Sequence, residues 1–163
     1  MKARNAVLVS LALVAAVTLT AVAAAGPDAA KQRVMITTQA AQTTDVSPFV
    51  LTTLQGGALK GDSGKMVAGA SSFNGRTVMR EGQEVSINEG PATLKGKRGT
   101  LVIRTRSEWV TAGNGYHVAV DSWKVVRGTG QYAGVTGGGR GGSVWVEGAD
   151  NWSSQLEGFL TLP

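Results

Sequence analysis

The chain has 163 residues, a formal net charge of +5, one histidine, 23 glycines and no cysteine. This length suits one domain with a sizeable hydrophobic core. The lack of cysteine excludes disulfide bonds, thiolate metal sites and a catalytic thiol within this chain, so packing and hydrogen bonding must hold its fold together.

The first 25 residues have the pattern of a secretory signal peptide. Lys2 and Arg4 precede an apolar run that begins near Ala6, and small residues allow cleavage after Ala23 or after Ala25. We expect a secreted protein that has no stable membrane insertion once the peptide is removed. An uncleaved N-terminal anchor is the alternative, although the run is rich in alanine and contains hydroxyl side chains. Removal of the peptide lowers the formal net charge to +3.

Residues 26–45 are rich in Ala, Gln and Thr and show no sustained periodicity. They are predicted to form a flexible tether, in which "VMIT" could pair as a short strand. The folded domain is predicted to span residues 46–163.

From residue 46 onward, short apolar runs alternate with turn residues. Strands are expected at 46–54 and 65–73, in "RTVMR", "EVSIN", "PATLKG" and "GTLVIRTRSEWV", at 116–127, and in "GSVWVEG" and "SSQLEGFLTL". The pairs Asn74-Gly75, Glu81-Gly82 and Asn114-Gly115 are expected at turns. No amphipathic helix interrupts these runs. About eight strands with short loops predict an all-β, antiparallel fold, either a barrel or a sandwich.

The stretch "GTGQYA", residues 128–133, fits the dinucleotide-binding pattern G-x-G-x-x-G/A. That function requires a helix directly after the glycines. Here "GVTGGGRGG" follows, and its glycines disfavour a helix. Glycine also permits positive φ and close backbone approach, so the stretch predicts a sharp turn that seats Tyr132 inward.

The longer stretch "WKVVRGTGQYAGVTGGGRGG", followed by "VWVEG" and "SSQLEGFLTL", resembles the C-terminal half of the allene oxide cyclase-like barrels. That superfamily includes the plant dirigent proteins and many secreted bacterial proteins. The matching positions are Gly128, Thr129, Gly130, Tyr132, Gly134, Gly137 and Gly139. The resemblance implies an eight-stranded antiparallel barrel with a central cavity and no metal or organic cofactor. It also makes a homo-oligomer an expectation. No catalytic acid, Tyr or Asn of the plant members aligns with this chain through a shared motif.

The expected strand at 101–110 places Arg104, Arg106 and Glu108 on one face. This charged row is either the solvated exterior, which the cost of burying unpaired charge favours, or a paired cluster inside the lumen. In the second case Glu108 is a candidate catalytic acid or base. Arg104 and Arg106 are then candidate ligand-binding residues.

On the strand at 116–127, His117, Asp121 and Trp123 share a face. Trp123 leads into the glycine turn and is expected to be buried, so Asp121 and His117 are inward-facing catalytic candidates. An exposed histidine beside a turn, and an aspartate hydrogen-bonded to a neighbouring strand, are the simpler alternatives. Trp123, Tyr132 and Tyr116 are candidate ligand contacts, with core or rim packing as the alternative.

The remaining polar residues point to no further partner. One histidine and scattered carboxylates predict no metal site. The basic residues are dispersed apart from "KGKR" at 95–98, which is expected at a hairpin tip, so no nucleic-acid partner is predicted.

Three functions stay open. The first is a secreted barrel that binds a small, mainly apolar molecule in its lumen. The second is a cofactor-free enzyme of the cyclase or isomerase type, with Glu108 or Asp121 inside. The third is a structural, envelope-associated module with a filled barrel. Inward polar residues around an open cavity would favour the enzyme, a purely apolar cavity would favour binding, and a plugged lumen the structural module.

Overall fold

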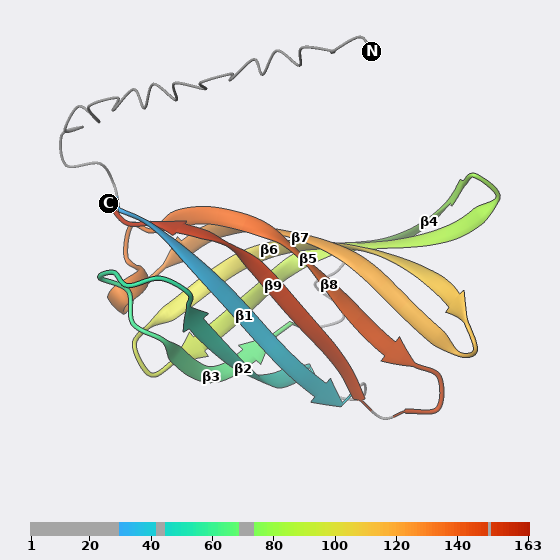
Figure 1. Ribbon diagram of the computed structural model, residues 1–163, viewed down its shortest axis with the longest axis horizontal. Helices are drawn as coiled ribbons and strands as arrows, with labels where there is room; N and C mark the ends of the chain where they lie inside the picture. Colours follow the sequence, from blue (N-terminus) through green and yellow to red (C-terminus); the bar gives the residue numbers. More distant parts are fainter. Residues whose placement is uncertain (1–29, 42–44, 69–73, 150) are drawn as a thin grey trace, which may run out of the picture.

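The structure, a computed structural model, describes residues 30–41, 45–68, 74–149 and 151–163 (Figure 1). Over these ranges the chain is all-β. The expected signal helix falls on residues 1–25, outside the described residues. The elements are β1 (Lys31–Ala41), β2 (Val46–Thr53), β3 (Asp62–Val67), β4 (Asn74–Arg80), β5 (Gln83–Gly96), β6 (Thr100–Gly113), β7 (Tyr116–Gly128), the 3-10 helix η2 (Gly130–Tyr132), β8 (Thr136–Val146) and β9 (Asn151–Thr161).

The nine strands form one antiparallel sheet in the order β3-β2-β1-β9-β8-β7-β6-β5-β4. An additional pairing of β3 with β5 closes eight of these strands into a ring and leaves β4 outside it, paired with β5. In Figure 1, β4 and the adjoining part of β5 extend away from the ring. The predicted all-β, antiparallel fold is confirmed.

The flexible tether predicted for residues 26–45 needs correction, because Lys31–Ala41 is a strand of the ring. β1 pairs with β9 over its whole length and with β2 from Val34 to Thr38. Val34 and Ile36 point into the core at 0% and 2% exposure. The alternation of apolar and polar residues is clear only around Val34 and Ile36. The strand pattern therefore does not stand out among the surrounding Ala, Gln and Thr. The described fold therefore begins before Val46.

β5 is one continuous strand where two had been expected. It pairs with β4 up to Glu89 and with β3 from Thr93 onward. Pro91 lies between these two stretches, where β5 has no partner on that side among the described residues, which is a place where a sheet tolerates proline. Glu81-Gly82 and Asn114-Gly115 have positive φ and form the predicted tight turns. Asn74-Gly75 instead begins β4.

The hydrophobic core fills one end of the ring. Its largest fully buried side chains include Phe49, Leu94, Leu101, Tyr132 and Leu160. Full burial of a large apolar side chain contributes about 1.5–3 kcal/mol, so this cluster is the main source of stability. The core is confined to one end, and the other end can therefore hold a cavity.

The glycine-rich stretch makes the predicted sharp turn at the packed end. Gly130 has φ of 61°, and a Cβ there would lie less than 3.0 Å from the carbonyl oxygen of Arg98. Within β8, a Cβ on Gly139 would meet the carbonyl oxygen of Glu157 on β9 just as closely. This backbone path therefore requires glycine, and it carries Tyr132 into the core.

Candidate functional site

The end of the ring that the core leaves open contains a cavity of about 670 Å³. Its floor is apolar: Ile36, Met66, Ala92 and Leu156 belong both to the hydrophobic core and to the cavity wall. The cavity therefore lies directly on the packed end.

Above the floor runs a polar belt, formed by small polar side chains from six strands. The register places Asn88 opposite Ser107 and Ser107 opposite Asp121. Ser143 hydrogen-bonds to Asp121 and lies opposite Ser154, which in turn lies opposite Thr38. All belt residues line the cavity: Thr38 on β1, Asn88 on β5, Ser107 on β6, Asp121 on β7, Ser143 on β8 and Ser154 on β9.

Nearer to solvent lies an aromatic row, made up of Trp109, His117, Trp145 and Trp152 on the adjacent strands β6 to β9. His117 pairs with Trp145 and Trp145 with Trp152 across the sheet. The His117 and Trp145 rings stack with centroids 4.2 Å apart and planes 23° apart. All four side chains are half-buried, which shows where the cavity meets solvent.

Asp121 is the single carboxyl among the described residues of the cavity wall, and only 2% of it is exposed. Ser143 Oγ donates a hydrogen bond to Asp121 Oδ2 at 2.5 Å. Oδ1 is buried and has no hydrogen-bond partner within the described part of the chain. Burial raises the pKa of Asp121, and two hydroxyls counteract this rise. One belongs to Ser107, which faces Asp121 across the sheet without a hydrogen bond to Oδ1, and the other belongs to Ser143. A buried acceptor without a partner is costly, so this oxygen keeps an unused capacity to accept a hydrogen bond.

His117, the other titratable residue of the described wall, does not contact Asp121. Its Nδ1 lies 3.3 Å from Thr111 Oγ1. His117 and Asp121 are four residues apart on β7, about 13 Å along a strand that rises about 3.3 Å per residue. The structure thus places both predicted candidates on the cavity side without making them a catalytic pair.

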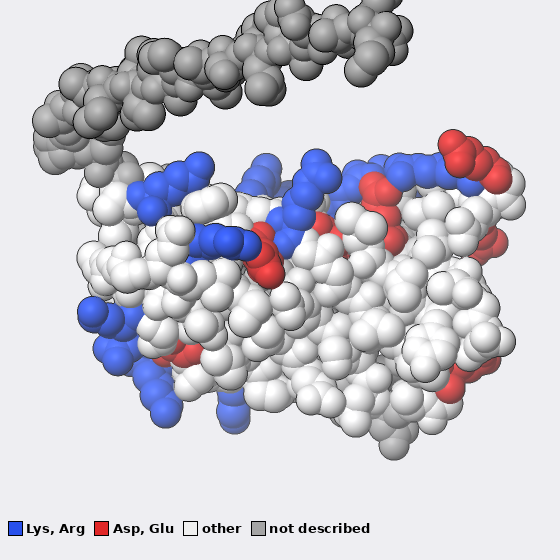
Figure 2. All heavy atoms as spheres, viewed as in Figure 1, with Lys and Arg blue, Asp and Glu red and all other residues white. Residues whose placement is uncertain are grey.

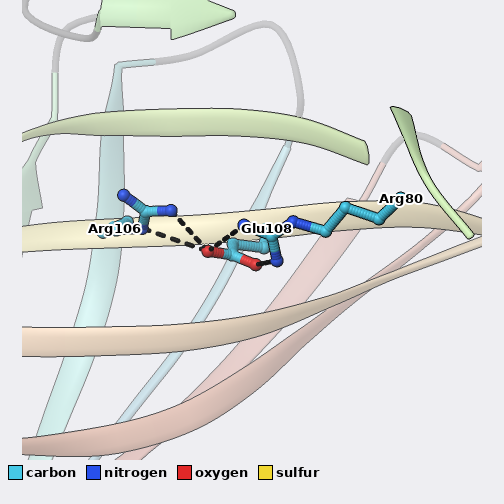
Figure 3. A network of polar contacts seen from close by, with 3 residues as sticks. All are labelled: Arg80, Arg106 and Glu108. Carbon is cyan, nitrogen blue, oxygen red and sulfur yellow. Dashed lines mark hydrogen bonds and ion pairs between the residues drawn. The ribbon is translucent and has the colours of Figure 1, made fainter. Parts of the chain in front are cut away.

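Glu108, Arg104 and Arg106 lie on the exterior of β6, the interpretation that the sequence favoured. The alternative of a paired cluster inside the lumen, which made them site candidates, is wrong. Figure 3 shows Arg106 and Arg80 reaching Glu108 from opposite sides. Arg104 Nε contacts Glu89 Oε1 at 2.8 Å. Hydrogen bonds from Arg106 and Arg80 lower the pKa of Glu108. Glu108 therefore remains charged outside the ring and does not face the cavity.

The three aromatic ligand-contact candidates also lie away from the cavity wall. Tyr116 is 49% exposed at the start of β7. Trp123 is buried in the core, and its Nε1 donates to the carbonyl oxygen of Glu157 at 3.2 Å. Tyr132 is buried with its hydroxyl on Asp62. The packing alternative therefore describes Trp123 and Tyr132.

Sequence reasoning missed most of the polar belt. The alternation along β6 places Ser107 on the strand face opposite Glu108, and this is the face that lines the cavity. Ser143 was recognisable only through its position two residues before Trp145, on the same side of β8. Trp123 was the tryptophan put forward as a ligand contact, whereas Trp109, Trp145 and Trp152 line the cavity.

Comparisons with protein-family models, curated proteins and solved structures find no match to this chain. Across the described ranges, no group of three or more His, Asp or Glu residues could hold a metal ion. The same ranges contain no helix of the length and apolarity needed to cross a membrane.

Proposed function

We propose that the protein is a secreted, barrel-type binding protein that holds a small, mainly apolar organic molecule in the cavity. The observation that carries this proposal is the aromatic row above an apolar floor, because aromatic and aliphatic walls with a few polar groups are typical of ligand pockets. The volume of about 670 Å³ lies in the range of such pockets.

The resemblance to the allene oxide cyclase-like barrels is part of this proposal. That resemblance implies eight barrel strands around a central cavity, and a ring of eight strands with a cavity toward one end supports it. A secreted location and a homo-oligomer follow from the N-terminal pattern and from the resemblance. A structural module with a filled lumen is less well supported, because the core fills only one end.

A cofactor-free isomerase is the second candidate, and the polar belt favours it. Asp121 is a buried residue of the cavity wall, and its Oδ1 has no hydrogen-bond partner among the described residues. A group that transfers a proton to or from a ligand needs such an oxygen. However, His117 does not pair with Asp121, so a single carboxyl would have to serve as both acid and base. Inward polar residues around an open cavity favour an enzyme, but the described cavity wall holds no second acid or base next to Asp121, so we take binding as the better supported function.

Titration with N-phenyl-1-naphthylamine, a neutral apolar fluorophore, tests the binding proposal. We expect saturable enhancement of its fluorescence and weaker binding by Trp145→Ala, because Trp145 lines the cavity. Val120→Ala is the matched control, since Val120 is 65% exposed on the outer face. Failure of the wild-type protein to bind the fluorophore would contradict the proposal.

Native mass spectrometry separates binding from catalysis. A molecule retained through purification would be released and incubated with fresh wild-type protein and with Asp121→Asn. Conversion by the wild-type protein alone would support the isomerase, whereas unchanged recovery from both proteins supports binding.

A further inference from the structure

We infer that the cavity selects an organic cation, namely a protonated amine carried on an apolar or aromatic body. This inference rests on the proposed function, because it names the class of molecule that the cavity would bind. It is argued from the charge of the cavity wall, from the hydrogen bonds of Asp121 and from the position of the tryptophans.

The charge of the cavity wall is one-sided. The described wall contains one carboxyl group, that of Asp121, and no lysine or arginine. Figure 2 shows basic side chains on the outer surface of the face in view, where salt screens their charges over about 8 Å. An anionic ligand would meet a like charge without any compensating cation. A cationic ligand would meet an opposite charge on a carboxyl group that is only 2% exposed, where electrostatic interactions are stronger than in bulk water.

The hydrogen bonds of Asp121 are incomplete in a way that a protonated amine would complete. Ser143 occupies Oδ2, whereas Oδ1 is buried without a partner among the described residues. An ammonium group supplies several N–H donors and a positive charge. It could therefore bind Oδ1 and still donate to hydroxyl oxygens of the polar belt. A neutral alcohol could satisfy Oδ1 but would leave the carboxylate charge uncompensated.

The tryptophans suit the rest of such a molecule. Trp109 lies opposite Ala119, so along β7 it lies between His117 and Asp121. Trp145 and Trp152 continue the aromatic row on β8 and β9. Tryptophan faces attract organic cations and also pack against apolar rings. A buried carboxylate below several tryptophans combines both features that recognise an amine with an apolar body.

A matched ligand series tests this inference at pH 7.5. The compounds 2-phenylethylamine, 2-phenylethanol and phenylacetate share one apolar body and differ in charge, and each would compete with bound N-phenyl-1-naphthylamine. For the wild-type protein we expect the amine to compete about tenfold more tightly than the alcohol, with phenylacetate weakest. An amine that competes no better than the alcohol would overturn the inference.

Two variants locate the source of the preference. In Asp121→Asn the ratio between the amine and alcohol constants should approach 1, whereas Glu108→Gln, which removes an exterior carboxyl, should keep the wild-type ratio. A preference that survives in Asp121→Asn overturns the inference. If the wild-type protein does not bind the fluorophore, the proposed function itself fails. If it binds the fluorophore without preferring the amine, only the inference fails.

Discussion

The Tyr132 hydroxyl donates a hydrogen bond to Asp62 Oδ2 at 3.0 Å, across 70 residues of sequence. Asp62 also accepts hydrogen bonds from the backbone amides of Ser63, Lys97 and Arg98, at 2.8, 2.9 and 3.3 Å. One buried carboxylate therefore joins η2 to the start of β3 and to the tip between β5 and β6. The cluster stabilises the packed end of the ring, where the pairing of β3 with β5 closes it.

Replacement of Tyr132 by phenylalanine should lower the free energy of unfolding by about 1–2 kcal/mol, because it leaves a buried carboxylate with one donor fewer. Urea unfolding at pH 7 measures the change. Tyr116→Phe is the control, since Tyr116 is exposed and should shift the free energy by less than about 0.5 kcal/mol. Equal effects of the two substitutions would show that the hydrogen bond to Asp62 does not matter.

Alkaline pH should weaken the wild-type protein through Tyr132. Burial raises the pKa of its hydroxyl above the ordinary value of 10.0, and Asp62 raises it further. As pH rises above 10.0, the unfolded chain loses this proton while the folded chain keeps it, so the stability of the folded state falls. Urea midpoints at several alkaline pH values should decline more steeply for wild type than for Tyr132→Phe. Parallel declines would refute this assignment.

The alternation of side chains predicted the two faces of β6 and β7, because neighbouring residues of a strand point to opposite faces. Arg104 and Glu108 are outside, and Asp121 and Trp123 are inside, as a period of two requires. The pairing of β1 with β9 could not be predicted from local sequence, since these strands lie at opposite ends of the described chain. The belt serines were also hidden, because a serine side chain suits either face of a strand.

Asp121→Asn should raise the melting temperature at pH 7. Burial raises the pKa of the Asp121 carboxyl above 3.8, so the folded chain binds its proton more tightly than the unfolded chain does. Stability then falls as pH rises from about 3.8 through the higher pKa of the folded state, and the full loss is present above it. Asparagine keeps an acceptor for Ser143 without a charge. We expect a gain on the order of a few degrees.

The acid range provides the control for this prediction. Below pH 3.8 the Asp121 carboxyl is largely protonated in both the folded and the unfolded chain. The difference in melting temperature between the variant and wild type should therefore shrink. A variant that is less stable than wild type at pH 7 would show that the charge of Asp121 contributes to folding.

Substitution of valine for Gly130 or Gly137 should destabilise the fold strongly. Both glycines have positive φ, and a Cβ at either position would lie less than 3.0 Å from a carbonyl oxygen on a neighbouring segment. Gly56→Val is the matched control, because a Cβ there has nothing within 4 Å. Thermal unfolding followed by circular dichroism compares the three variants. Melting temperatures of Gly130→Val and Gly137→Val equal to that of Gly56→Val would contradict this account of the turn.

The separation of a packed end from an open end determines which residues can be substituted without loss of the fold. Residues such as Leu101 and Leu160 hold the ring closed without facing the cavity, whereas Ser107, Ser143 and Ser154 face it and are small. Exchange of one belt serine for another small residue changes the polar groups that contact a ligand. It leaves the packing that closes the ring intact. A few side chains of the cavity wall can therefore change which ligands the same scaffold binds. A set of belt variants is a practical starting point for designed receptors.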